Sequence, residues 1–194
     1  MDHLSELFLK LKLGVEETKG LDLGDVDTAI NALQSNNEEF DETTIENILK
    51  SVVALLEIDE PESKAKVLML IAEIAKSEET RVPCVKAGLI ATILSNLESE
   101  DPNIVLQSLR AIGNISYDNE LAKSALAEHK GAEKIVKKLG VLEKSFDENS
   151  DNKLELAACG SMLNVASDDE ALTRRSSVIW SSIIFVGLCE TESP

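Results

Sequence analysis

Hydrophobic residues recur along this chain at the spacing of an amphipathic helix. Between residues 102 and 116 the apolar positions lie four and three residues apart, at Val105, Leu109, Ile112 and Ile115. Residues 152–166 show similar spacing at Leu156, Cys159, Leu163 and Ala166. Such spacing places side chains on one face of a helix, so we expect a long helix with a buried stripe in each segment.

The end of each long segment belongs to an internal repeat. LIAEIAKSEE (70–79), AIGNISYDNE (111–120) and SMLNVASDDE (161–170) align without gaps. Their matching central residues Glu73, Asn114 and Asn164 are separated by 41 and 50 residues. These separations bracket the period of about 40 to 47 residues that is typical of armadillo and HEAT arrays.

The segments between the long helices indicate which kind of array this is. Residues 81–99 and 121–145 each read as a short helix, a glycine hinge at Gly88 or Gly131, and a second helix. Glycine suits such a hinge because the chain must adopt a positive φ or allow a close approach there. Two short helices followed by a long one are the plan of an armadillo repeat. The sequence therefore predicts an all-α, right-handed armadillo superhelix of about three repeats with an N-terminal helical cap.

The repeat divides the chain into three parts. Residues 1–61 are predicted to form the cap and an incomplete first repeat, with helices at 25–34 and 43–57. Residues 62–170 hold the armadillo repeats, and Asp101 followed by Pro102 predicts the start of a long helix. Residues 171–194 form a divergent tail because they lack the expected hinge.

Composition and charge narrow the class of partner. The chain has 43% hydrophobic residues, only 3% aromatic residues, four prolines and nine glycines, which favours an aliphatic helical core. Its formal net charge of -17 repels nucleic acid and anionic membrane surfaces and attracts basic proteins. We therefore expect a basic protein partner, no nucleic acid and no direct membrane insertion.

The cysteines and the chain ends predict a cytoplasmic location. Cys84, Cys159 and Cys189 are odd in number and lack the spacing of a metal site, which fits a reducing compartment. The first residues are amphipathic and acidic, unlike a signal peptide. The most apolar stretch, residues 178–188, is much shorter than the roughly 20 residues of a membrane-spanning helix.

The sequence shows no constellation for catalysis. His3 and His129 have no neighbouring cysteine or serine partner, and the chain lacks a glycine-rich phosphate loop and an HExxH motif. We expect no catalytic residue, no metal site and no cofactor. The chain is predicted to be a binding protein.

The repeated asparagines are the clearest candidates for binding. Asparagine is a mediocre helix former, so Asn114 and Asn164 at equivalent positions require an explanation. In similar armadillo proteins the third helices line a groove with asparagines that hydrogen-bond to a bound chain. The alternative is that each asparagine ties its helix to neighbouring backbone. The candidates for partner contact are Glu73, Arg110, Asn114, Tyr117 and Asn164.

The sequence does not favour a nuclear import receptor. Those receptors place a tryptophan four residues before each asparagine, where it holds the stem of a lysine. The equivalent residues here are Met69, Arg110 and Gly160. Without the tryptophans, and with a cation at position 110, a basic import signal is not the expected ligand.

Three segments carry a more specific resemblance. ESKAKVLMLIAEIAKSEETRVPCVKAGLI (62–90), LQSLRAIGNISYDNE (106–120) and KGAEKIV (130–136) resemble the N-terminal repeats of the small-GTPase GDP-dissociation stimulators, known as SmgGDS. The resemblance covers about residues 62–170. It implies armadillo repeats throughout and binding of Rho or Rap GTPases with polybasic, prenylated tails, as a chaperone or a guanine-nucleotide exchange factor.

The chain differs from that family in two ways, and each difference leads to an expectation. We expect a chain shortened to about three repeats, with weak or no nucleotide exchange on a Rho-type GTPase. Its tail carries an uncharged apolar run at residues 178–188, and we expect self-association through this run. The alternative function is a scaffold or adaptor that binds unrelated peptides in its groove.

Overall fold

The computed structural model describes residues 23–35, 42–56, 59–144 and 153–166, and the regular elements in these ranges are helical. They are α2 (Leu23–Ser35), α3 (Glu42–Leu55), α4 (Pro61–Ile74), α5 (Glu78–Lys86), α6 (Leu89–Ser95), the 3-10 turn η1 (Asn96–Glu98), α7 (Pro102–Ser116), α8 (Glu120–Glu128), α9 (Gly131–Lys144) and α10 (Lys153–Ala166). Residues 1–22 and the tail, residues 171–194, lie outside the described residues.

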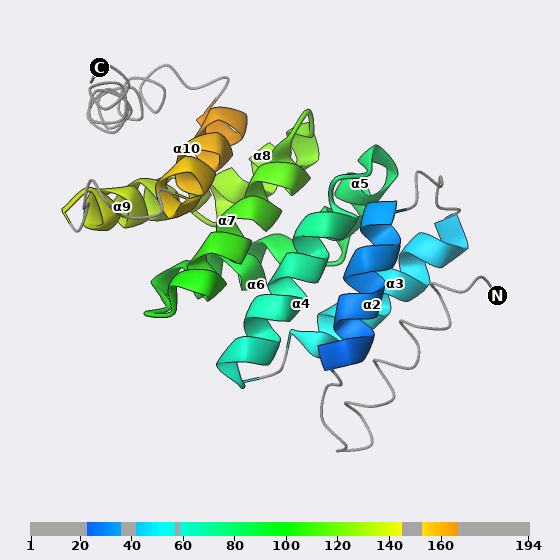
Figure 1. Cartoon of the computed structure of the whole chain (residues 1–194). Coiled ribbons are helices and arrows are strands. Elements are labelled where there is room, and N and C mark those ends of the chain that lie inside the picture. The colour runs from blue at the N-terminus through cyan, green and yellow to red at the C-terminus, as the bar shows by residue number, and fades with distance from the viewer. Residues whose placement is uncertain (1–22, 36–41, 57–58, 145–152, 167–194) are drawn as a thin grey trace, which may run out of the picture.

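The helices are arranged as repeats of three. Helices α5, α6 and α7 form one unit, and α8, α9 and α10 form the next. The long third helices α4, α7 and α10 lie side by side in a row, with α2 on the other side of α4 (Figure 1). Each long helix contacts the next one in the row, which is the arrangement that the 41- and 50-residue spacing predicts.

Helix α7 begins where the sequence predicts. The Asp101 side chain accepts hydrogen bonds from the backbone amides of Asn103 and Ile104, at 2.8 and 3.4 Å, and Pro102 occupies the first turn. Helix α4 begins in the same way, with Glu60 as its N-cap before Pro61. A side-chain acceptor satisfies amides that would otherwise lack an intrahelical partner.

The two hinges use glycine for different physical reasons. Gly88 has φ +78°, a left-handed conformation that disfavours any side chain. In the second hinge it is Lys130 that has positive φ, at 54°, while Gly131 allows a close approach. A Cβ atom at Gly131 would lie 2.6 Å from Leu126 Cδ2. Both alternatives predicted for a hinge glycine therefore occur, one at each hinge.

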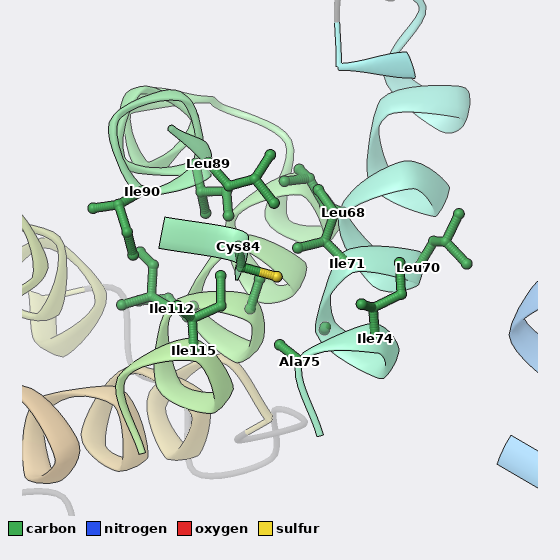
Figure 2. Close-up of a cluster of buried hydrophobic side chains, with 14 of the residues drawn as sticks. Leu68, Leu70, Ile71, Ile74, Ala75, Cys84, Leu89, Ile90, Ile112 and Ile115 are labelled. Atoms are coloured by element: carbon green, nitrogen blue, oxygen red, sulfur yellow. The ribbon is translucent and has the colours of Figure 1, made fainter. Parts of the chain in front are cut away.

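The core is aliphatic and continuous through the row. In Figure 2, side chains of α4, α5, α6 and α7 converge, among them Ile71, Cys84, Leu89 and Ile112. The predicted stripe of α7 is confirmed, since each of its members is at most 1% exposed, namely Val105, Leu109, Ile112 and Ile115. Burying each such side chain stabilises the fold by roughly 1.5 to 3 kcal/mol.

The predicted stripe of α10 is wrong in part. Cys159 is buried, but Leu156 and Leu163 are exposed. The reason is that α10 packs against α7 through Ser161, whose hydroxyl donates to the Leu109 carbonyl. This contact turns Ala158 and Met162 inward and leaves the two leucines on the side of α10 away from α7. The side chain of Ala166 lies outside the described residues.

Candidate partner-binding surface

The repeated central residues lie on consecutive members of the row. Glu73 lies on α4, Asn114 on α7 and Asn164 on α10. Both asparagine side chains are half-buried, so part of each amide faces solvent. With Arg110, which also lies on α7, four of the five predicted contact residues lie along one succession of long helices.

Each asparagine braces its helix to the preceding one. Asn114 Nδ2 donates to the Ala72 carbonyl at 2.7 Å, and Asn164 Nδ2 donates to the Gly113 carbonyl at 2.9 Å. Ala72 and Gly113 are themselves equivalent positions, each one residue before the central residue of its repeat. The contact is thus the same in both interfaces. It is the tie to neighbouring backbone that the sequence left open as the alternative.

The brace leaves one end of each amide available. Nδ2 of Asn114 and of Asn164 is engaged, while Oδ1 accepts no hydrogen bond from the described part of the chain. An amide oxygen can accept two hydrogen bonds. The same side chain can therefore hold the row together and accept a donor from a bound partner.

Glu73 and Arg110 form a second link between α4 and α7. The Glu73 side chain is 1% exposed, and its Oε1 lies 3.0 Å from Arg110 Nη2. Its Oε2 accepts a hydrogen bond from Lys76 Nζ at 2.5 Å. Arg110 also donates from Nη1 to Gln107 Oε1 at 2.8 Å. The arginine that the sequence suggested would repel a basic ligand is therefore compensated by a buried carboxylate.

Tyr117, the fifth predicted contact residue, follows α7 and is 57% exposed. Arg81 of α5 lies over its ring, with Cζ 5.1 Å from the centroid, and donates from Nη1 to the Tyr117 carbonyl at 3.3 Å. A guanidinium over an aromatic face is stabilising. Tyr117 is thus held in place by Arg81 while its side chain remains accessible.

The starts of α4 and α7 carry an acidic edge, which we define as Asp59, Glu62, Glu98 and Glu100. All four residues are exposed, and the two helix starts lie on the same side of the row (Figure 1). Acidic side chains are stabilised near a helix N-terminus by the helix dipole. The sequence alone does not bring these carboxylates together, because which helix starts are neighbours depends on the fold.

The described residues contain no group of three or more potential metal ligands and no helix long and apolar enough to cross a membrane. Burial raises the pKa of the Cys84 thiol to about 12. Burial, with repulsion from Glu155, raises that of Cys159 to about 11. Both thiols are protonated at neutral pH and are poor nucleophiles.

Replacing both braces by alanine tests their structural role. Asn114→Ala/Asn164→Ala is expected to lower the free energy of unfolding by about 2 kcal/mol, about 1 kcal/mol for each lost hydrogen bond. Helical content should be nearly unchanged, since the apolar core is intact. Urea unfolding and circular dichroism measure both. Asn103→Ala, at the exposed start of α7, is the matched control. A double variant as stable as that control would show that the braces contribute nothing.

The chain is similar in sequence to two frog proteins. It is 36% identical over 173 residues to Rap1 GTPase-GDP dissociation stimulator 1-A of Xenopus laevis, a match that covers 89% of this chain and 28% of that protein. It is 35% identical over the same length to Rap1 GTPase-GDP dissociation stimulator 1-B of that species. The chain thus spans less than a third of these relatives. No protein-family model matches it.

Solved structures agree with the fold. A designed armadillo repeat protein in complex with the peptide (KR)4 superposes with a TM-score of 0.66 at 18% identity, covering 92% of this chain and 70% of that one. Computationally designed armadillo repeat proteins for modular peptide recognition give 0.62 at 18% identity, covering 92% and 71%. These comparisons confirm the predicted armadillo fold and the predicted resemblance to the GDP-dissociation stimulators.

Proposed function

We propose, on the premise that this chain is a relative of the small-GTPase GDP dissociation stimulators, that it binds small GTPases of the Rho or Rap type. The observation that carries the proposal is the 36% identity over 89% of the chain. The chain is then a regulatory binding protein of the cytoplasm rather than an enzyme with catalytic residues. It acts as a chaperone for GTPases with polybasic, prenylated tails, and release of GDP is a further activity to be measured separately.

The row of long helices supplies the contact surface in this proposal. Asn114 and Asn164 would offer their Oδ1 atoms, which accept no hydrogen bond within the described residues, to a bound chain. Arg110 and Lys76, which would oppose a basic tail, share the carboxylate of Glu73, so the three residues together carry a charge of +1 rather than +2. The acidic edge lies at the starts of α4 and α7, at the opposite ends of these helices from Glu73 and Asn114, and attracts the tail there. Tyr117 adds an exposed aromatic side chain beyond the end of α7.

Electrostatic attraction makes binding sensitive to salt. We expect the affinity for a GTPase with a polybasic tail to fall about tenfold or more between 50 and 200 mM NaCl, because the Debye length shortens from about 14 to about 7 Å. Titration calorimetry with prenylated GTPases, with and without the basic tail residues, measures this. An affinity that does not change with salt would contradict the electrostatic part of the proposal.

Neutralising the acidic edge tests whether the salt-sensitive contact lies at this edge. Asp59→Asn, Glu62→Gln, Glu98→Gln and Glu100→Gln together should remove most of the salt dependence. The matched control changes the same number of exposed carboxylates on other helices, namely Glu78, Glu120, Glu128 and Glu133, to glutamine. Equal losses in the two variants would mean that only the net charge of -17 matters and that the edge is not the contact.

A peptide-binding scaffold is the second candidate function. It is favoured by the free Oδ1 atoms, which can accept hydrogen bonds from the backbone of any extended chain. The two functions differ in what they require of the partner. A folded GTPase should bind more tightly than its isolated tail peptide if the first proposal is right. Equal affinities for the tail and for unrelated basic peptides would favour the scaffold.

A further inference from the structure

Arg110 fills a definite place at the junction between α4 and α7. Its side chain starts on α7 and reaches back to α4, where Nη2 donates to Glu73 Oε1 at 3.0 Å. On its own helix, Nη1 donates to Gln107 Oε1 at 2.8 Å. The Arg110 side chain is 34% exposed, so this place lies at the surface of the row and not in its core. The guanidinium thus lies at the surface between two side-chain oxygen acceptors.

The junction between α7 and α10 is built on the same brace but carries different side chains. The hydrogen bond from Asn164 to the Gly113 carbonyl repeats the one from Asn114 to the Ala72 carbonyl, so the two pairs of helices pack in the same register. The residues that correspond to Glu73, Gln107 and Arg110 are Asn114, Ala157 and Gly160. The second junction therefore has neither a cation nor a carboxylate at these three positions.

The place that Arg110 fills is open at the second junction. Gly160 has no side chain, and a Cβ atom built there would meet no neighbouring group within 4 Å. Ala157, one turn earlier on α10, has only a methyl group where Gln107 has its amide. Gly160 is half-buried, so part of its backbone reaches the surface. A side chain of arginine length is therefore missing from the surface between α7 and α10.

Two amide oxygens flank this open place. Asn114 corresponds to Glu73, so its Oδ1 is the counterpart of the acceptor that Arg110 reaches across the first junction. Asn164 lies four residues after Gly160 and therefore on the same side of α10. Nδ2 of each asparagine forms a brace, while Oδ1 accepts no hydrogen bond from the described residues. A ligand group that fits this place must therefore be a hydrogen-bond donor.

We infer that the open place between α7 and α10 is a binding site for one arginine side chain of a bound protein. The guanidinium lies above Gly160 and donates to Oδ1 of Asn114 and Asn164. Its planar fork of N–H groups suits two separate acceptors better than a compact ammonium group does. The net charge of -17 favours a cation over a neutral donor. This inference rests on the proposed function, since the arginine would belong to the basic tail of the GTPase.

Filling the open place with a side chain of the protein itself tests the site. Gly160→Met adds a long, unbranched side chain without changing the net charge, and the space above Gly160 admits it. We expect the affinity for octa-arginine to fall about tenfold, as for the loss of one hydrogen bond to a charged group. The affinity for octa-lysine should fall much less, because an ammonium group has no fork to bridge the two acceptors. Fluorescence anisotropy with labelled peptides measures both.

Gly140→Met is the matched control. Gly140 is also a half-buried glycine inside a helix, and a Cβ atom there likewise meets nothing within 4 Å, but it lies on α9 outside the row of long helices. This variant should bind both peptides as the wild type does. Gly160→Ala, whose methyl group is too short to fill the place, should keep the preference for arginine. Equal effects of methionine at positions 160 and 140, or a wild type without preference for octa-arginine, would overturn the site.

Titrating the same variants with a GTPase that has a basic tail separates the site from the proposed function. If both are right, Gly160→Met weakens binding of the GTPase and of octa-arginine alike. A wild type that prefers octa-arginine and loses this preference in Gly160→Met, yet binds no GTPase, would overturn the proposed function and support the site. Binding of the GTPase that is the same in Gly160→Met and Gly140→Met would overturn the site and leave the proposed function in place.

Discussion

Replacing Arg110 with methionine is expected to lower the free energy of unfolding by about 3 kcal/mol. The variant leaves the buried Glu73 carboxylate without its partner at 3.0 Å, and only Lys76, whose side chain is 55% exposed, still compensates it. Removing one member of a buried ion pair is destabilising because the remaining buried charge, here held by one half-exposed lysine, is less well compensated. Urea unfolding at neutral pH measures the change.

A double variant separates the charge from the packing. Glu73→Leu/Arg110→Met removes both charges and should recover most of the lost stability, since apolar replacement of a buried pair is often neutral. Asp59→Asn breaks the pair between Lys64 and the fully exposed Asp59 and should change stability by less than about 1 kcal/mol. If Arg110→Met were no more harmful than Asp59→Asn, the link between α4 and α7 would not depend on charge.

Gly131→Ala is expected to destabilise the chain by about 2 kcal/mol, although alanine is the better helix former. The added Cβ atom would meet Leu126 at three points, with Cδ2 at 2.6 Å and both Cβ and the carbonyl oxygen at 3.1 Å. Leu126 is fully buried, so its side chain cannot turn into solvent. Overpacking of this kind costs about 1 to 3 kcal/mol. Thermal or urea unfolding measures it.

Gly140 provides the matched control in the same helix. A Cβ atom there has nothing within 4 Å, so Gly140→Ala should raise stability by up to about 1 kcal/mol through helix propensity alone. Opposite signs at positions 131 and 140 are the expected result. A neutral or stabilising Gly131→Ala would mean that the hinge between α8 and α9 tolerates displacement and that the close approach is not required.

The sequence predicts those features of the fold that depend on local pattern and on repetition. The stripe of α7, its start at Asp101 and the alignment of Glu73, Asn114 and Asn164 are all visible as spacing or as a helix-start signal. They are predictable because an amphipathic helix buries one face wherever its neighbours lie. The structure confirms the stripe and the start of α7 for that reason.

Other features depend on which neighbour a helix meets. Spacing placed Leu156 and Leu163 in a stripe with Cys159, but the contact of Ser161 with α7 decides which side of α10 is buried. Likewise, the sequence pattern does not show whether the Asn114 side chain bonds to a ligand or to the backbone. Its hydrogen-bond acceptor, the Ala72 carbonyl, lies 42 residues away in the sequence. At the second hinge it is Lys130 that takes the left-handed position. Gly131 beside it accommodates Leu126.

The asparagine braces determine how the array responds when one interface between repeats is weakened. Each brace joins one long helix to its immediate predecessor, so the coupling between repeats is nearest-neighbour in character. In a one-dimensional system of this kind, weakening one junction lowers cooperativity at that junction and leaves more distant repeats as they were. If a bound chain engages Asn114 and Asn164 as proposed, it acts on the same junctions. Occupancy of this surface and the stiffness of the solenoid would then be thermodynamically linked.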